Sequence, residues 1–415
     1  MNSLVQVYQE RRQRLAQMAP GAVILVLAGF ENERNAFLQS SSFFYLTGIS
    51  EPGVALLIYP DGTSSLFIPQ TNGLRAKWVA GTITPQNAEN LGIERIEYLG
   101  TVISGYEPKV FIKAENYANL LGELQRVVEQ GLKLLAVDLG QLEPQTVIAQ
   151  LVGFNPKLKL SLGDASSLVA QLRRTKSDLE LDHLYQAIEV TNLAQEAAAT
   201  SIFPGAMECE VQAALEYVFT SSGCGIAFPS IVGSGKNSTV LHYNQNSAAM
   251  QDGDLVVVDI GARYRGYCAD ITRTYPVNGK FTERQLEIYE LVLKTQAYVA
   301  ELAMPGMWLS NAASPEQSLV HLAREFMREH GGYDQYFIHG IGHYLGLDTH
   351  DVGDTTTPLQ PGDVFTIEPG IYISEEKLGV RIEDNYWMTE KGVVCLSESI
   401  AKEPQEIEAL VASKW

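Results

Sequence analysis

The stretch Leu255-Val-Val-Val-Asp-Ile-Gly-Ala-Arg-Tyr-Arg-Gly-Tyr-Cys-Ala-Asp270 has two apolar, β-branched runs on either side of a turn that contains Gly and Arg. This pattern predicts an antiparallel hairpin in which each strand carries one aspartate, Asp259 and Asp270. If the turn is centred on Tyr264 and Arg265, the two carboxylates stand directly opposite each other, with Cβ atoms roughly 5 Å apart. Two buried like charges at that separation repel unless a cation lies between them. The stretch therefore predicts a metal site.

A second segment of the chain repeats the first. Pro361–Gly370 can be aligned with Asp252–Gly261, which places Glu368 where the first copy has Asp259. A further strand follows each copy and carries one more acid: Asp270 in the first and Glu383 in the second. Two such units related by a pseudo-two-fold axis would gather four carboxylates in one place. A single divalent ion rarely needs four, whereas two ions a few Å apart do.

Length and composition restrict the class of protein. A chain of 415 residues is long enough for two or three domains. Its formal net charge of −19 argues against nucleic acid or an anionic membrane surface as a partner. No apolar run reaches 18 residues, and the N-terminus predicts a helix and not a signal peptide. The four cysteines lack Cys-x-x-Cys spacing, which predicts reduced, mostly buried thiols and favours a cytoplasmic protein.

Residues 1–170 alternate short apolar runs with helical patterns, and this alternation predicts an α/β domain. The predicted strands are Val23–Ala28, Val54–Tyr59, Ser65–Pro69, Leu132–Asp138 and Lys157–Leu162. Helical patterns occur near residues 3–18, 72–79, 114–130 and 144–151. The aromatic stretch Ser41–Gly48 is either one wall of a substrate pocket or part of the core, and we interpret it as core.

The rest of the chain contains the order helix, Pro-Gly, helix twice. Ser177 and Glu180 have the spacing of a capping box and mark the start of the first long helix. The predicted helices are Ser177–Phe203 and Glu208–Ser221 in the first copy, and Thr282–Ala303 and Pro315–His330 in the second. We therefore expect a first domain of residues 1–170 and a duplicated α+β domain of residues 171–415.

The remaining candidate groups lie mainly in two glycine-containing loops. The first loop ends at His242, and the second contains His339, His343 and His350. A lone histidine in a core is more often structural, but these segments hold four of the chain's seven histidines and accompany four acids in apolar strands. Arg381 lies two residues before Glu383 and therefore on the same strand face, where we expect it to orient an acid or the substrate.

From Ser177 to its end, the chain resembles the pita-bread metallopeptidases, which include aminopeptidase P, prolidase, methionine aminopeptidase and creatinase. The metal ligands that this resemblance implies are Asp259, Asp270, His343, Glu368 and Glu383. The further site residues that it implies are His242, His339, His350 and Arg381. Creatinase is disfavoured because it does not keep this complete ligand set. Methionine aminopeptidase is disfavoured because it lacks a large leading α/β domain.

Residues 1–170 resemble the N-terminal domain of aminopeptidase P, best over Asn35–Gly53. Two departures are Ser41 or Ser42, where that domain often has an acid, and a short Ser374–Gly379 connection at the rim of the cleft. The resemblance implies an α+β fold, in which an N-terminal α/β domain precedes a pita-bread domain with internal pseudo-two-fold duplication. It also implies a homodimer or a homotetramer.

The resemblance further implies a reaction. Four carboxylates and one imidazole suit two divalent metal ions, of which Mn²⁺ is favoured and Co²⁺, Fe²⁺ and Zn²⁺ are alternatives. A hydroxide that bridges the two ions would attack the carbonyl group of the first peptide bond. Glu368 would move the proton to the leaving nitrogen, and His350 would stabilise the oxyanion. The remaining implied positions are His242 and His339 on the leaving side, and Arg381 beside Asp259.

Three functions stay open at this point. The first is an aminopeptidase that releases the N-terminal residue of peptides with proline in the second position. The second is prolidase, which is restricted to Xaa-Pro dipeptides and shares every metal and histidine position, so that only the N-terminal domain favours the first. The third is an inactive pita-bread protein that binds peptides, although such relatives usually lose metal ligands. The expected partners are peptides with an Xaa-Pro N-terminus, and neither nucleic acid nor a membrane.

Overall fold

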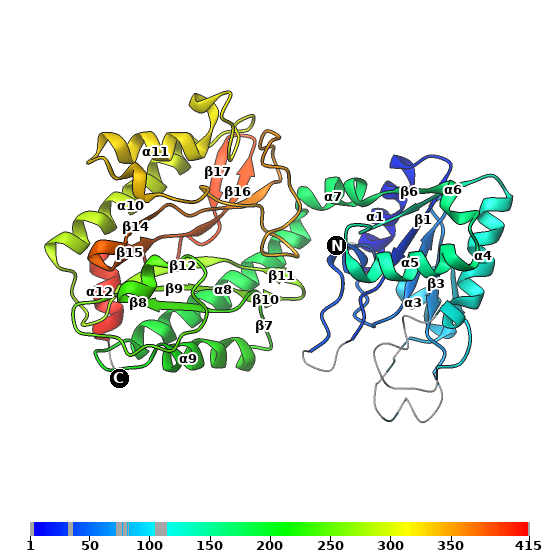
Figure 1. Cartoon of the computed structure of the whole chain (residues 1–415), viewed down its shortest axis with the longest axis horizontal. Coiled ribbons are helices and arrows are strands. Elements are labelled where there is room, and N and C mark those ends of the chain that lie inside the picture. The colour runs from blue at the N-terminus through cyan, green and yellow to red at the C-terminus, as the bar shows by residue number, and fades with distance from the viewer. Residues whose placement is uncertain are drawn as a thin grey trace. The chain divides into compact units, whose positions relative to one another are not determined.

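A computed structural model of the chain describes residues 4–31, 36–71, 77, 81, 83–103 and 114–413. The chain divides into two compact units, Met1–Arg173 and Arg174–Trp415 (Figure 1). Each unit has a hydrophobic core of its own. Among the described residues, none of the helices combines the length and the apolar character needed to cross a bilayer.

Unit 1 is built on a sheet that, in its described part, has six strands in the order β4-β3-β2-β1-β5-β6. These strands are β1 (Ala22–Leu27), β2 (Ala55–Ile58), β3 (Ser64–Ile68), β4 (Arg95–Tyr98), β5 (Lys133–Ala136) and β6 (Leu162–Asp164). Its helices are α1 (Leu4–Met18), α2 (Ser41–Thr47), α3 (Ala88–Leu91), α4 (Ala118–Glu129), α5 (Leu142–Phe154), α6 (Leu158–Ser161) and α7 (Ser166–Arg174). The central strand β1 is buried along its whole length, which explains its unbroken apolar sequence.

The predictions for unit 1 are mostly confirmed. Strands β1, β2, β3 and β5 lie within two residues of the predicted ones, whereas the sequence reading missed β4. The strand predicted over Lys157–Leu162 is wrong, because backbone bonds from Leu158 to Asn155 and from Leu160 to Lys157 close a helical turn there. The aromatic stretch forms α2, whose Phe43 side chain is fully buried, and this confirms its interpretation as core. The helix predicted over 72–79 falls on a segment of which the structure describes only Lys77.

Unit 2 packs a long helix against strands in each of its two halves (Figure 1). Its helices are α8 (Asp178–Ser201), α9 (Glu208–Ser221), α10 (Glu283–Leu302), α11 (Leu319–Glu329) and α12 (Pro404–Ala412). The four predicted helices are thus confirmed as α8 to α11, and α11 begins late because Pro315–Gln317 forms a 3₁₀ turn. The helix α8 starts with the predicted capping box, in which Glu180 accepts hydrogen bonds from the backbone N–H and the hydroxyl of Ser177.

The strands of unit 2 form four small sheets in its described part. The sheet strands are β7 (Gly225–Ile226), β8 (Ile231–Ser234), β9 (Leu255–Ile260), β10 (Ala262–Tyr264), β11 (Tyr267–Cys268), β12 (Ile271–Pro276), β13 (Val364–Ile367), β14 (Gly370–Ile373), β15 (Leu378–Arg381), β16 (Asp384–Thr389) and β17 (Gly392–Cys395). The sheet orders are β12-β9-β8 and β11-β10-β7 in the first half, and β13-β16-β17 and β14-β15 in the second. In each half the hairpin that carries the two acids is therefore split into two ladders.

The first hairpin has a different register from the predicted one. Asp259 pairs with Thr272 and not with Asp270, so the prediction of directly opposed carboxylates is wrong. The turn consists of Arg265 and Gly266, whose φ angles of 48° and 90° are both positive. Such a turn favours glycine, and its position one residue later shifts the pairing by two residues. Because side chains alternate with a period of two, both aspartates still face the same side.

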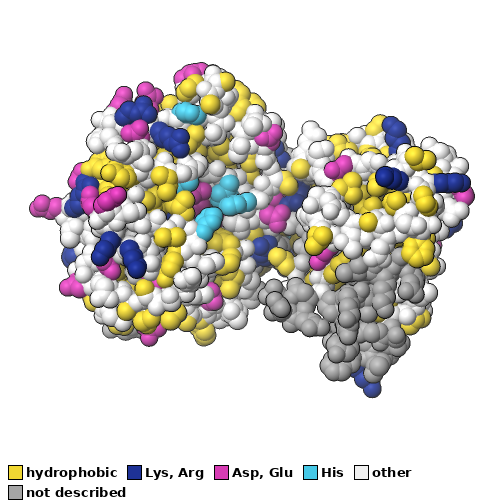
Figure 2. Space-filling model, in the orientation of Figure 1, with side chains coloured by type: hydrophobic (Ala, Val, Ile, Leu, Met, Phe, Trp, Pro, Cys, Tyr) yellow, Lys and Arg dark blue, Asp and Glu magenta, His cyan; other side chains and the backbone are white. Residues whose placement is uncertain are grey.

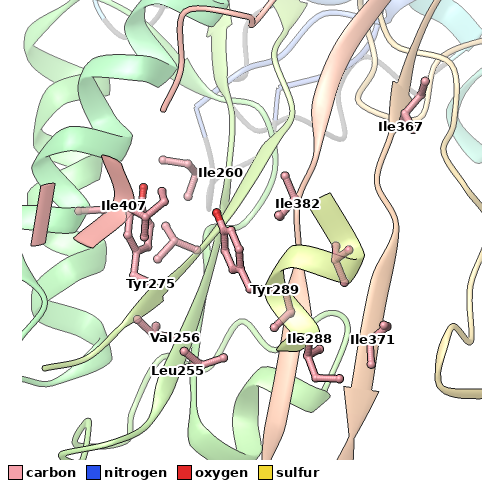
Figure 3. Close-up of a cluster of buried hydrophobic side chains, with 14 of the residues drawn as sticks. Leu255, Val256, Ile260, Tyr275, Ile288, Tyr289, Ile367, Ile371, Ile382 and Ile407 are labelled. Atoms are coloured by element: carbon pink, nitrogen blue, oxygen red, sulfur yellow. The ribbon is translucent and has the colours of Figure 1, made fainter. Parts of the chain in front are cut away.

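The core of unit 2 joins the two halves. Figure 3 shows buried side chains of this core, which come from strands of both halves and from helices α10 and α12, with the following residues labelled: Leu255, Val256, Ile260, Tyr275, Ile288, Tyr289, Ile367, Ile371, Ile382 and Ile407. Close packing of this kind resists relative movement, so the strands that carry the acids are held at fixed positions. Only Cys268 among the four free cysteines is buried, and the prediction of mostly buried thiols is therefore wrong.

A candidate metal centre in unit 2

A pocket of about 670 Å³ opens in unit 2. Its lining includes all of the site residues that the sequence predicted: His242, Asp259, Asp270, His339, His343, His350, Glu368, Arg381 and Glu383. Figure 2 shows histidine side chains gathered on one face of this unit, next to acidic side chains. The structure thus brings the nine positions together, whereas their individual roles stay predictions.

A compact group of acids surrounds one histidine in this pocket. The Nε2 atom of His343 lies 3.3 Å from Asp270 Oδ2, 3.6 Å from Glu368 Oε1 and 3.9 Å from Glu383 Oε1. One ligand atom each from Asp270, His343 and Glu383 lies within 4.8 Å of the others, a spacing that can hold a metal ion. Asp270, Glu368 and Glu383 lie between the paired segments of the split hairpins, where the backbone leaves the regular ladder.

The acids of the pocket have more oxygen atoms and more potential negative charge than the surrounding protein groups satisfy. Three buried carboxylate oxygens that line this pocket lack a hydrogen-bond partner among the described residues: Asp259 Oδ1, Asp270 Oδ1 and Glu383 Oε1. Burial raises the pKa of Asp270 and of Glu383 well above the usual range, and the neighbouring carboxylates raise both further. Unpaired buried charges of this kind are costly. Divalent cations would satisfy these oxygens and offset the repulsion, so the residues fit a metal centre with oxygen ligands.

Metal removal should therefore destabilise the protein. We expect chelator-treated protein to unfold at a lower temperature than the same protein with Mn²⁺, because bound cations relieve the repulsion between the acids. At a free Mn²⁺ concentration of about 100 times the dissociation constant, the gain is about 2.7 kcal/mol. Differential scanning calorimetry with and without added Mn²⁺ measures it. An unchanged unfolding temperature at saturating Mn²⁺ would count against the centre.

The imidazole of His343 is held in one orientation. Its Nδ1 lies 3.0 Å from the carbonyl oxygen of Tyr344, which can only accept a hydrogen bond. Nδ1 therefore carries a proton, and Nε2 faces the acids. Backbone contacts of this type fix the tautomer of histidine ligands in metal sites. The loop thus holds His343 with Nε2 toward the acids, the orientation that a metal ligand would need.

A hydrogen-bonded chain leads from Asp259 to a second histidine. Arg381 donates from Nη2 to Asp259 Oδ2 at 2.7 Å and from Nη1 to the hydroxyl of Tyr372 at 3.0 Å. That hydroxyl lies 2.9 Å from His339 Nε2, and His339 Nδ1 lies 2.8 Å from the carbonyl oxygen of Gly340. Burial, aided by the charge of Arg381, lowers the pKa of His339 to about 4. His339 is therefore neutral at pH 7, with both ring nitrogens engaged.

Sequence reasoning missed three residues that hold these groups. Thr272 donates from its hydroxyl to Glu383 Oε2 at 2.7 Å, and Asn385 donates to the carbonyl oxygen of Asp270. Tyr372 joins Arg381 to the second histidine, as described above. Thr272 lies two residues after Asp270, and this spacing on a strand could have identified it. The contacts of Asn385 and Tyr372 depend on tertiary packing and leave no spacing signal.

The other two histidines lie on the open side of the pocket. The rings of His343 and His350 are 4.2 Å apart between centroids. Burial lowers the pKa of His350, and the neighbouring His343 and His242 lower it further, so His350 is neutral at pH 7. A neutral imidazole in a pocket can donate a hydrogen bond to an oxygen atom that gains negative charge.

The profile of metallopeptidase family M24 matches residues 182–390, which span the whole pocket. The chain belongs to metallopeptidase family M24. The profile of the aminopeptidase P N-terminal domain matches residues 8–105. Together these matches confirm the fold class predicted from the sequence, an N-terminal α/β domain followed by a pita-bread domain.

Relatives within family M24 cover nearly the whole chain. The Xaa-Pro aminopeptidases of Haemophilus influenzae and Escherichia coli are both 34% identical to it, over 97% and 98% of the chain and 96% and 98% of their own lengths. The human Xaa-Pro dipeptidase is 27% identical, over 97% of the chain and 91% of its own length. A solved structure of E. coli aminopeptidase P with the inhibitor Pro-Leu matches with a TM-score of 0.83 and 31% identity, over 100% of this chain and 99% of that one.

Proposed function

We propose that the chain is a metal-dependent aminopeptidase that releases the N-terminal residue of peptides with proline in the second position. The observation that carries this proposal is the complete set of acids and histidines around one pocket, in an M24 chain that is similar to Xaa-Pro aminopeptidases over nearly its full length. The bound Pro-Leu of the E. coli structure agrees with it, because that dipeptide is what remains after cleavage in front of proline.

The candidate ligands would hold two divalent cations. These ligands are Asp259, Asp270, His343, Glu368 and Glu383. Mn²⁺ is the proposed metal, because hard oxygen ligands dominate the set, and Co²⁺, Fe²⁺ and Zn²⁺ are alternatives. When bound, the cations would lower the pKa of a water molecule and polarise the substrate carbonyl group.

Two side chains of the pocket can manage protons and charge during the reaction. Burial raises the pKa of Glu368, while His343 and Arg381 oppose the rise. A carboxyl group whose pKa moves toward neutrality suits proton transfer, so Glu368 would carry a proton to the leaving nitrogen. The neutral His350 would donate a hydrogen bond to the oxygen atom of the tetrahedral intermediate.

The rest of the pocket suits a proline ring. Its lining includes the apolar side chains of Phe228, Pro229, Ile231 and Leu241, close in sequence to His242. An Xaa-Pro bond has no N–H group, so sites that require this donor reject it. An apolar wall with histidines needs no such donor. We propose that His242 and His339 line the side of the leaving proline, and that Arg381 orients Asp259.

A paired assay decides between this function and prolidase. We expect a tetrapeptide Xaa-Pro-Yaa-Zaa to release its first residue in the presence of Mn²⁺, and a matched Xaa-Ala-Yaa-Zaa peptide to stay intact. Chromatography of the products measures both reactions. An Xaa-Pro dipeptide is assayed as a third substrate, and its hydrolysis without hydrolysis of the tetrapeptides would instead support prolidase. Protein that binds Mn²⁺ and hydrolyses neither peptide would support an inactive peptide-binding protein.

Three further properties belong to the same proposal. We propose domains of residues 1–170 and 171–415, and the division into units at Arg173 and Arg174 supports them. A homodimer or homotetramer rests on the resemblance to the family alone. A cytoplasmic location rests on the composition and on the absence of Cys-x-x-Cys spacing in the sequence.

A further inference from the structure

A buried glutamine of α8 lies behind the first pair of acids. The Nε2 atom of Gln195 donates to the carbonyl oxygens of Ile271 at 2.9 Å and Val258 at 3.3 Å. These two residues are the immediate neighbours of Asp270 and Asp259 in the chain. The side chain is 1% exposed, so protein groups must satisfy its amide. One amide therefore bridges the two strands that carry the acids of the first half.

A second glutamine has the same position in the second half. Gln296 of α10 donates from Nε2 to the carbonyl oxygens of Ile367 at 3.0 Å and Ile382 at 3.2 Å. These residues directly precede Glu368 and Glu383, and Gln296 is also 1% exposed. Each glutamine stands nine residues before a Pro-Gly pair, which ends the helix in both copies. The duplication thus extends to the groups that hold the acids.

The orientation of both amides is fixed by what their oxygens accept. Gln195 Oε1 accepts a hydrogen bond from the hydroxyl of Tyr275 at 2.9 Å. Gln296 Oε1 accepts one from Lys402 Nζ at 3.3 Å, and an ammonium group can only donate. In both cases the NH₂ group must face the two carbonyl oxygens. A flipped amide would place three oxygen atoms together.

The two bridges stand at the ends of ladders, next to the interruptions that contain acids. In the second half, one ladder ends at the pair Ile367–Asp384 and the next begins at Gly370–Arg381. Glu368 lies in this interruption, where a single long backbone bond, from Ile382 N–H to the carbonyl oxygen of Pro369 at 3.4 Å, joins the two strands. A side-chain amide that binds a carbonyl group on each strand adds a second link between them. In the first half, Ile271 forms the last pair of its ladder before the interruption and Val258 lies within that ladder, so Gln195 holds the end of the ladder next to Asp270.

We propose that Gln195 and Gln296 are positioning residues of the metal centre. Each amide fixes the spacing of one pair of acids, Asp259 with Asp270 and Glu368 with Glu383. The inference rests on the proposed metal-dependent function, because the acids must bind cations for their spacing to matter. Loss of groups that hold metal ligands typically lowers metal affinity 10- to 100-fold.

The test replaces each glutamine by methionine, which keeps the length of the side chain and removes both donors. We expect Gln195→Met and Gln296→Met each to lower the affinity for Mn²⁺ by about 10- to 100-fold, measured by titration calorimetry on chelator-treated protein. Thr295→Val is the matched control. Thr295 is fully buried beside Gln296, and its hydroxyl donates within its own helix, to the carbonyl oxygen of Leu291 at 2.7 Å. Its substitution should leave the Mn²⁺ affinity unchanged.

The unfolding temperature of each variant, measured in the presence of chelator, distinguishes a positioning role from a general contribution to stability. Variants that lose stability as Thr295→Val does, but bind Mn²⁺ as tightly as the wild type, would overturn the inference. If a methionine variant fails to fold, Gln195→Asn and Gln296→Asn decide, because the shorter amide keeps its polarity but cannot span both strands. Wild-type protein that binds Mn²⁺ and cleaves no Xaa-Pro peptide would reject the proposed function and leave this inference intact.

Discussion

Replacing Glu383 by glutamine should lower kcat/KM for an Xaa-Pro peptide by more than about 100-fold. Removal of a group that only supports a metal ligand typically costs about 10- to 100-fold, and Glu383 is itself a proposed ligand. Glutamine keeps the shape of the side chain but removes the negative charge and one acceptor oxygen. Glu383 is 2% exposed and its Oε1 lies 3.9 Å from His343 Nε2. We therefore expect the variant to lose bound metal as well, measured by elemental analysis of the purified protein.

The stability of Glu383→Gln distinguishes a lost ligand from a damaged fold. In wild-type protein without metal, the pKa of Glu383 is raised above its unfolded value of about 4.3, so ionisation above that pH destabilises the folded state. In chelator at pH 7, the variant should unfold at a temperature equal to or above that of the wild type. Glu376→Gln, at an exposed ion pair with Arg284, is the control and should keep full activity. Full metal content and activity in Glu383→Gln would reject the proposed centre.

Replacing Asp384 by asparagine should lower the free energy of unfolding by about 3–5 kcal/mol, the cost of breaking a buried ion pair from one side. Asp384 and Arg273 are both fully buried, with Oδ1 and Nη2 2.8 Å apart. Lys402 Nζ lies 2.8 Å from the other oxygen of Asp384. Arg273 also donates to the carbonyl oxygen of Glu383 at 2.7 Å, so this pair supports the strand behind the metal centre.

The pH dependence of this variant follows from the direction of the pKa shift. Burial alone would raise the pKa of Asp384, but the charges of Arg273 and Lys402 outweigh it and lower the pKa. The stabilisation is therefore fully present above the unfolded pKa of about 3.9 and is lost as the pH falls through the folded value. Urea denaturation at pH 7 should show the full difference between wild type and variant.

Urea denaturation below pH 4 should show a smaller difference between wild type and Asp384→Asn, because Asp384 of the unfolded wild type is then protonated and folding must remove that proton to form the ion pair. Asp334→Asn provides the matched control. Its partner Arg328 is exposed and Asp334 itself is partly exposed, so we expect a loss of less than about 1 kcal/mol at either pH. A loss that small for Asp384→Asn at pH 7 would contradict the prediction.

The acids and histidines of the pocket could be predicted because they stand in a pattern that occurs twice. Asp259 and Glu368 follow the same Gly-Asp turn at the same distance, and a second acid follows each. Acids are seldom buried in apolar strands unless they are paired or bind a metal, so two copies of such a strand indicate a functional site. The register of the first hairpin could not be predicted in the same way. It depends on Arg265 and Gly266 taking positive φ angles, and a turn one residue earlier fits the apolar pattern equally well.

The groups that hold the acids were harder to predict, because their partners are fixed by tertiary packing. Gln195 and Gln296 bond to backbone carbonyl groups, which every residue has, so residue type alone gives no signal. Their equal distance from the Pro-Gly pairs could have identified them. The strand predicted over Lys157–Leu162 shows an error of the other kind, in which a sequence pattern predicts an element that does not form. Its leucines alternate with polar residues, but Leu160 is 89% exposed and the segment forms a helical turn.

The acids of the pocket come in equal numbers from the two halves of unit 2. Asp259 and Asp270 belong to the first half, and Glu368 and Glu383 to the second. Neither half alone contains enough of the proposed ligands for two cations, so we expect tight capture of Mn²⁺ during refolding to wait until the halves have docked. Docking brings together segments far apart in the chain, which makes it a slow event. The time course of Mn²⁺ uptake after dilution from denaturant would therefore follow the last tertiary step of refolding.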